Sequence, residues 1–231
     1  MAALLAAMLI CMLIALIPLR KMFYFGPSVG KTDYLEIFRY MFPVALAYLC
    51  YSALTTFDMV LVRYYFSTAD SGDYALAQML GKIFLFLPAA ISLVMFPRTS
   101  GLSAQARETI PTLKKSLTYT AILAAVACVF YNLFPAFVLT VLTGKAYPGS
   151  ILLGRLFSVS MSFFTLLLVL VTYFLSVKDM RFIKYLTGFT ILLIAGIILM
   201  HKTLVGVLLI IYSCSIALFF THLVLVFKKT R

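Results

Sequence analysis

The sequence predicts an all-α, polytopic membrane protein built as a bundle of about seven transmembrane helices. Of its 231 residues, 64% are hydrophobic and only 11% are charged, whereas a soluble domain has roughly 45–50% apolar and about 25% charged residues. Mean hydropathy is +1.10. A chain of this length has too little interior to bury so much apolar surface, so lipid is expected to cover its outside.

Seven segments are long and apolar enough to cross a bilayer. About twenty apolar residues span the hydrocarbon core as a helix, which satisfies its backbone polar groups internally. Pro88 and Pro135 lie inside the third and fourth segments and should kink them. The predicted spans are Ala2–Leu19, Met41–Val62, Tyr74–Phe96, Leu117–Leu142, Ile151–Val177, Phe182–Met200 and Thr203–Phe227.

The first span is expected to stay in the mature protein. It lacks a preceding basic region and a small-residue cleavage site, and Arg20 and Lys21 follow it, which is the wrong polarity for a signal peptide. Residues 1–40 are predicted to form this helix and a cytoplasmic amphipathic connector, and residues 41–231 a six-helix lobe.

Two connectors on the predicted cytoplasmic side are long enough to hold surface helices. Asp33 and Glu36 fit a capping box that would open the first of these, which runs into Phe42. Thr109 followed by Pro111 predicts the start of the second, since proline is tolerated in a first turn.

The basic residues alternate along the chain in a way that predicts its orientation. Fourteen of the 19 Lys and Arg residues lie in the first, third and fifth connectors and the C-terminal tail. The other connectors hold only Arg63, Lys145, Arg155 and Lys202, and Lys82 lies within a span. Because cytoplasmic loops are enriched in positive charge, the N-terminus should be outside and the C-terminus inside. The net charge of +12 then indicates contact with membrane lipids, and no nucleic-acid partner is expected.

No metal site, cofactor or catalytic motif is predicted. Thiolate ligands of a metal must cluster, whereas the four cysteines and two histidines are dispersed: Cys11, Cys50, Cys128, Cys214, His201 and His222. Ser/His/Asp sets, HExxH motifs and phosphate loops are likewise missing from the sequence.

Three ionisable residues in the spans are candidates for function, because such groups are costly in the bilayer. Arg63 lies at the outer end of its helix, where it either snorkels to the interface or joins a site. Asp58 and Lys82 both lie about 12 Å below the turn that joins the second and third spans. Their matched depth on adjacent antiparallel helices predicts an ion pair.

Hydroxyl and amide side chains extend this site. Tyr48, Tyr51, Ser52, Thr55 and Asp58 recur at helical spacing as one polar stripe, and Gln78 lies one turn from Lys82 on the facing helix. These residues either line a water-accessible cavity, which we favour, or hydrogen-bond between packed helices. For a further stripe on the fifth span we favour packing: Ser158, Ser162, Thr165 and Thr172.

A distinctive set of residues marks the run from Phe57 to Ser100 and the end of the next span. The set is Asp58 in an apolar helix, Gly72 and Tyr74 after the short outer turn, Pro88, Phe96–Pro97, and the later Gly144, Lys145 and Tyr147. The pattern resembles Wzx-type polysaccharide flippases, of the multidrug/oligosaccharidyl-lipid/polysaccharide exporter superfamily. The resemblance implies that the chain corresponds to helices six to twelve of a two-lobed transporter. The missing N-terminal lobe would mean a partial gene product, a separately encoded partner lobe, or a second copy of the chain.

The resemblance also implies a function, which is translocation of undecaprenyl-pyrophosphate-linked oligosaccharide across the bacterial cytoplasmic (inner) membrane for cell-surface polysaccharide such as O-antigen. Lys82 would then contact the phosphates and Asp58 would hold Lys82 between substrates. Two alternatives stay open: a cation-coupled multidrug exporter that uses Asp58, and an intramembrane polysaccharide polymerase or ligase. We expect a transporter and no enzyme, because the outer connectors are too short to carry the loop that such an enzyme would use. The predicted substrate-binding residues are Lys82, Asp58, Gln78, Thr55, Ser52, Tyr48 and Arg63.

Overall fold

The computed structural model describes residues 34–105, 107–145 and 147–229. The chain divides into two compact units, residues 1–41 and 42–231. The first predicted span, Ala2–Leu19, and Asp33 lie outside the described residues. Within the described part of the chain all regular structure is helical, without strands.

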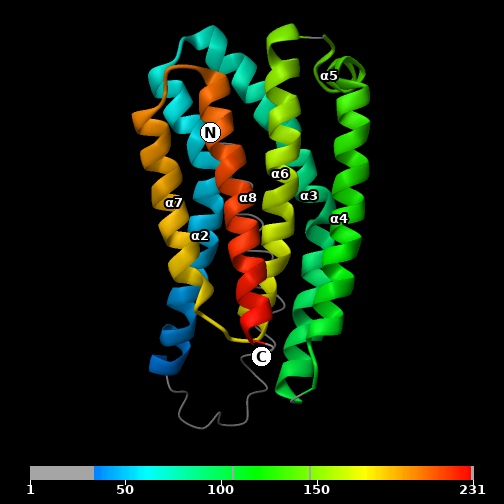
Figure 1. Ribbon diagram of the computed structural model, residues 1–231, viewed down its shortest axis with the longest axis vertical. Coiled ribbons are helices and arrows are strands. Elements are labelled where there is room, and N and C mark those ends of the chain that lie inside the picture. Colours follow the sequence, from blue (N-terminus) through cyan, green and yellow to red (C-terminus); the bar gives the residue numbers. More distant parts are fainter. Residues whose placement is uncertain (1–33, 106, 146, 230–231) are drawn as a thin grey trace, which may run out of the picture. The chain divides into compact units, whose positions relative to one another are not determined.

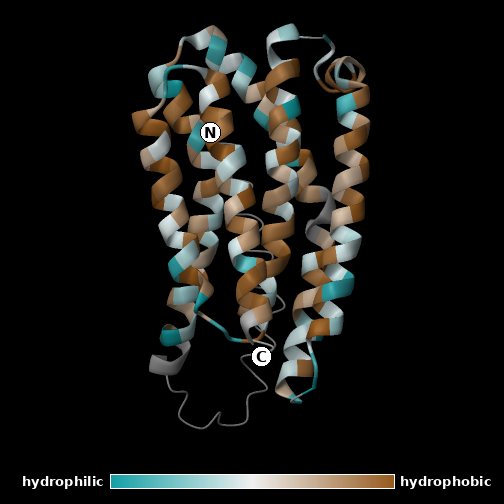
Figure 2. Ribbon diagram, viewed as in Figure 1, coloured by the Kyte–Doolittle hydropathy of each residue, from teal (hydrophilic) through white to brown (hydrophobic). Residues whose placement is uncertain are grey.

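Six of the helices in the described part are long and apolar enough to span a membrane, which confirms the all-α membrane fold. Hydrophobic residues cover most of their length, and hydrophilic residues concentrate toward the ends and connectors (Figure 2). Figure 1 shows the helices, which are α2 (Tyr34–Tyr65), α3 (Thr68–Ala104), α4 (Ile110–Leu133), the short α5 (Pro135–Thr143), α6 (Pro148–Ser176), α7 (Phe182–Leu199) and α8 (Leu204–Lys229).

Two predicted surface helices are instead the first turns of long helices. α2 is continuous from Tyr34, and α4 begins at Ile110, with Thr109 as its N-cap and proline in its first turn. The start at Thr109 is therefore confirmed, but a separate surface helix at either place is not. Extending an existing helix adds one hydrogen bond per residue without a new nucleus, so these polar stretches continue the adjacent span.

The fourth predicted span is interrupted where a kink was expected. α4 ends at Leu133, Phe134 leaves the helical region with φ −125° and ψ 52°, and α5 begins at Pro135. Proline lacks the amide hydrogen that the helix needs and disfavours a helical residue before it. The helix is thus broken at Phe134, whereas α3 continues as a helix through Pro88.

Helix α6 is the centre of the bundle and packs against α3, α4 and α8 (Figure 1). In its most apolar stretch of 18 residues 67% are buried, compared with 22% in the corresponding stretch of α4. Gly81 of α3 allows the close approach, because a Cβ there would lie 3.1 Å from the Met161 side chain of α6. Thr165 of α6 donates a hydrogen bond to the carbonyl of Phe84 in α3 (2.9 Å). The packing interpretation of the α6 hydroxyl stripe is confirmed at this residue.

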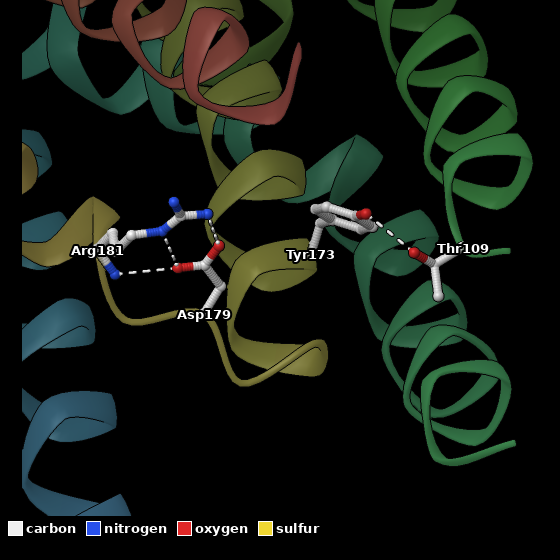
Figure 3. Close-up of polar contacts among 4 residues, drawn as sticks. All are labelled: Thr109, Tyr173, Asp179 and Arg181. Atoms are coloured by element: carbon white, nitrogen blue, oxygen red, sulfur yellow. Dashed lines mark hydrogen bonds and ion pairs between the residues drawn. The ribbon is translucent and has the colours of Figure 1, made fainter. Parts of the chain in front are cut away.

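Polar contacts fix the connectors at the end of the bundle that is predicted to be cytoplasmic (Figure 3). The hydroxyls of Thr109 and Tyr173 are 2.9 Å apart and hydrogen-bonded, which joins the start of α4 to the last turns of α6. Between α6 and α7, Arg181 donates from Nε and Nη2 to the two carboxylate oxygens of Asp179 at 2.9 and 2.7 Å. These hydrogen bonds and the Asp179 charge raise the pKa of Arg181.

Candidate functional site

The α2–α3 hairpin sets the register of the candidate site. Ser67 caps α3, since its hydroxyl accepts a hydrogen bond from the amide of Asp70 (3.2 Å). Ser71, one turn into α3, donates from its hydroxyl back to the carbonyl of Val62 in α2 (3.4 Å). The Ser71 hydrogen bond ties the two helices together beside a tight turn, so residues at equal distance from the turn meet.

Asp58 of α2 lies about two helical turns before this tight turn and is buried, with 1% of its surface exposed. The phenol of Tyr74 donates to Oδ2 at 2.7 Å, and the amide of Gln78 donates from Nε2 to Oδ1 at 2.8 Å. Both donors belong to α3, one turn apart, and are also buried. The ring of Tyr74 meets Phe157 of α6 edge-on, with the centroids 5.0 Å apart. This polar triad, Asp58–Tyr74–Gln78, joins α2 to α3 against the central helix.

The predicted ion pair between Asp58 and Lys82 is wrong. Among the residues that the structure describes, Lys82 makes no ion pair or hydrogen bond, and both oxygens of Asp58 accept from neutral donors. The prediction took Tyr74 as the start of the third span, whereas α3 begins at Thr68. Lys82 therefore lies about two turns beyond Tyr74 along nearly the same helical face, and Tyr74 and Gln78 reach the carboxylate instead. Lys82 is instead half-buried and lines a surface pocket of about 450 Å³ with Gln78, Met79 and Phe86.

The predicted polar stripe of α2 divides into an inner and an outer part. Thr55 is buried and donates to the carbonyls of Tyr51 and Ser52 in its own helix. The hydroxyl of Tyr51 donates to the carbonyl of Phe164 in α6 (3.1 Å). Tyr48 and Ser52 are exposed. The inner residues thus serve packing, and only the outer ones have surface available for a ligand.

Arg63 is exposed near the end of α2, and the structure does not bring it into the triad.

A second pocket, of about 350 Å³, is lined by residues of both predicted hydroxyl stripes. Tyr48 of α2, Thr172 of α6 and Ser92 of α3 line it, together with apolar side chains. The Ser92 hydroxyl is buried and has no hydrogen-bond partner in the described structure. Sequence reasoning missed Ser92, because an isolated serine in an apolar helix gives no signal of its own. It also missed the pairing of Tyr74 with Asp58, although Tyr74 and Gln78 share the spacing of one helical face.

Metal-ligating side chains do not gather in the described part of the chain. No three residues among His, Cys, Asp and Glu there lie close enough to hold an ion. The groups available for chemistry at the candidate site are therefore a cation at Lys82, a buried carboxylate and several hydroxyls.

Comparison with known proteins identifies the family of this chain. A family model described as "Polysaccharide biosynthesis protein" matches residues 1–152, which include the triad, Lys82 and all of α3 and α4. Searches of curated proteins and of solved structures give no match. Because the match covers well over half of the 231 residues, the chain, a multi-pass membrane protein with a role in polysaccharide synthesis or export, belongs to the polysaccharide biosynthesis protein family.

Proposed function

We propose that this protein moves undecaprenyl-pyrophosphate-linked oligosaccharide across the bacterial cytoplasmic membrane. The observation that carries the proposal is Lys82, a cation in a membrane span that has no ion-pair or hydrogen-bond partner among the described residues and lines a pocket. A charge without a close partner at such a depth is costly and marks a substrate path. An ammonium group there would compensate the diphosphate of a lipid-linked sugar as it leaves water.

Asp58 has a different role in this proposal from the one expected from sequence. Its carboxylate is held by Tyr74 and Gln78, so it stabilises the hairpin that carries Lys82. Tyr48 and Ser52, which are exposed on α2, would supply hydroxyls to the sugar. A partner lobe or a second copy of the chain would complete the cavity.

The test compares charge variants of Lys82 in the native host, where any partner lobe is present. Lys82→Gln should lower the appearance of lipid-linked oligosaccharide in the outer leaflet about ten-fold, since a hydrogen bond to a charged group contributes roughly 1.5–3 kcal/mol. Lys82→Arg should retain more transport, because it keeps the positive charge.

Lys145→Gln is the matched control, since Lys145 is exposed and lies after α5, and it should transport like the parent. If Lys82→Gln also transports like the parent at equal protein level, this lysine does not contact the substrate. If Asp58→Asn abolishes transport while Lys82→Gln does not, the cation-coupled exporter is the better explanation.

A further inference from the structure

We propose that a pocket between α3 and α4 binds the phosphate headgroup of an anionic glycerophospholipid at the membrane surface. The pocket has a volume of about 660 Å³ and is lined by residues from the last turns of α3 and the first turns of α4. It lies at the end of the bundle that the charge distribution predicts to be cytoplasmic. The proposal does not depend on which molecule is transported.

Two cations from different helices converge on this pocket. Arg98 is six residues before the end of α3 and Lys115 is five residues after the start of α4, so both lie roughly 7–9 Å from the helix ends. Both are exposed, and neither has an ion pair or hydrogen bond to another described residue. None of the described lining residues is acidic. The pocket therefore presents uncompensated positive charge at the depth of lipid headgroups.

The lining changes from polar to apolar toward the middle of α3. Ile91, Val94 and Met95 precede Arg98 on the same face at helical spacing, and Val94 is 71% exposed. On α4, Thr112 and Ser116 add hydroxyls, and Tyr119, 61% exposed, lies one turn beyond Lys115. This order matches a phospholipid, with its phosphate at the two cations and its acyl chains along Ile91 and Val94. Basic pockets between membrane helices on the cytoplasmic side are suited to such headgroups.

The start of α4 is positioned by contacts outside the pocket. The hydrogen bond between Thr109 and Tyr173 holds it against α6 (Figure 3), and Leu113 of its first turn is buried. Lys115 and Arg98 are therefore carried by helices that are fixed to one another, as a preorganised site requires.

The experiment measures lipid retention by the purified full chain with native mass spectrometry. The parent should retain phosphatidylglycerol in preference to phosphatidylcholine. Arg98→Gln and Lys115→Gln should each lower the apparent affinity for phosphatidylglycerol about five-fold, which corresponds to about 1 kcal/mol per basic residue near the surface. Lys115→Arg should retain binding, which would show that the loss in Lys115→Gln comes from the missing charge and not from misfolding.

Lys114 supplies the matched control, because it is exposed and adjacent to Lys115 but does not line the pocket. Lys114→Gln should bind phosphatidylglycerol like the parent. Equal retention of the two lipids, or equal losses in Lys114→Gln and Lys115→Gln, would overturn the proposal. Displacement of the lipid by an equal concentration of inorganic phosphate would overturn the lipid source, and retention of undecaprenyl diphosphate in place of phosphatidylglycerol would assign the pocket to the transported molecule.

Discussion

Asp58 shows how a buried carboxylate is held in a membrane span by neutral donors, with no ion pair in the described part of the chain. Its two oxygens accept from Tyr74 and Gln78, and all three side chains are buried. Hydrogen bonds to a charged group contribute more than those between neutral groups, and losing one partner leaves a buried acceptor unsatisfied. The triad is therefore expected to stabilise the hairpin more than any contact of Lys82.

A pair of double-mutant cycles tests this assignment. Tyr74→Phe with Asp58→Asn should show a coupling of about 0.5–3 kcal/mol in the free energy of unfolding, because the two residues touch. Lys82→Gln with Asp58→Asn should show a smaller coupling, because the two charges attract each other but make no ion pair. The measurement is unfolding in mixed detergent micelles. A larger coupling for Lys82 than for Tyr74 would restore the ion pair that the sequence predicted.

At the scale of helices, hydropathy predicted each described span but not where each helix ends. Hydropathy reports the length that lipid covers, whereas a helix continues as long as its backbone hydrogen bonds remain available. α3 accordingly starts at Thr68 and ends at Ala104, beyond both limits of its apolar segment. The break before Pro135 was foreseeable from proline chemistry, but whether it gives a kink or two helices depends on tertiary packing.

The candidate site was predictable to the level of helices and not of side chains. The prediction counted from a third span that starts at Tyr74, whereas α3 begins at Thr68 and the turn is shorter. Tyr74, Gln78 and Lys82 recur every four residues on nearly one face of α3, so position along the helix decides which of them meets Asp58. Hydropathy does not show where a helix starts, so Lys82 was chosen where Tyr74 and Gln78 are the partners.

Packing of α4 on α6 depends on the absence of a side chain at Gly154. A Cβ at this buried position would overlap the hydroxyl of Tyr131, whose ring is itself buried and meets Phe84 edge-on. Gly154→Ala should destabilise the protein by about 1–3 kcal/mol through overpacking.

Two further variants identify the cause in the same unfolding measurement. Tyr131→Phe removes the overlapping hydroxyl, which has no hydrogen-bond partner in the described structure, and should recover part of the loss when combined with Gly154→Ala. Gly188→Ala is the control, because a Cβ there meets nothing within 4 Å, and alanine is favoured over glycine in a helix by about 1 kcal/mol. Equal destabilisation at Gly188 and Gly154 would contradict the steric explanation.

At the scale of the whole chain, orientation connects the proposed function with the proposed lipid site. Both require the end that carries Arg98, Lys115 and the Asp179–Arg181 pair to face the cytoplasm. The alternation of Lys and Arg between connectors supports that orientation. A cysteine probe of this orientation needs an exposed position. Two residues at the outer ends of the helices are unsuitable, because Ser71 is 2% exposed and a side chain at Gly149 would overlap the carboxylate of Asp73.

Single cysteines at exposed positions of the connectors test the orientation directly. In a background without Cys11, Cys50, Cys128 and Cys214, cysteines at Ala69 and Lys202, which are exposed, should react with a membrane-impermeant thiol reagent added to intact cells. Cysteines at Gln105 and Glu108, which are also exposed, should react only after the membrane is opened. Because all four positions are solvent-accessible, lack of labelling reports the side of the membrane and not burial. Reversed labelling would place Arg98 and Lys115 outside. It would contradict both the orientation predicted from the basic residues and the proposed cytoplasmic lipid site.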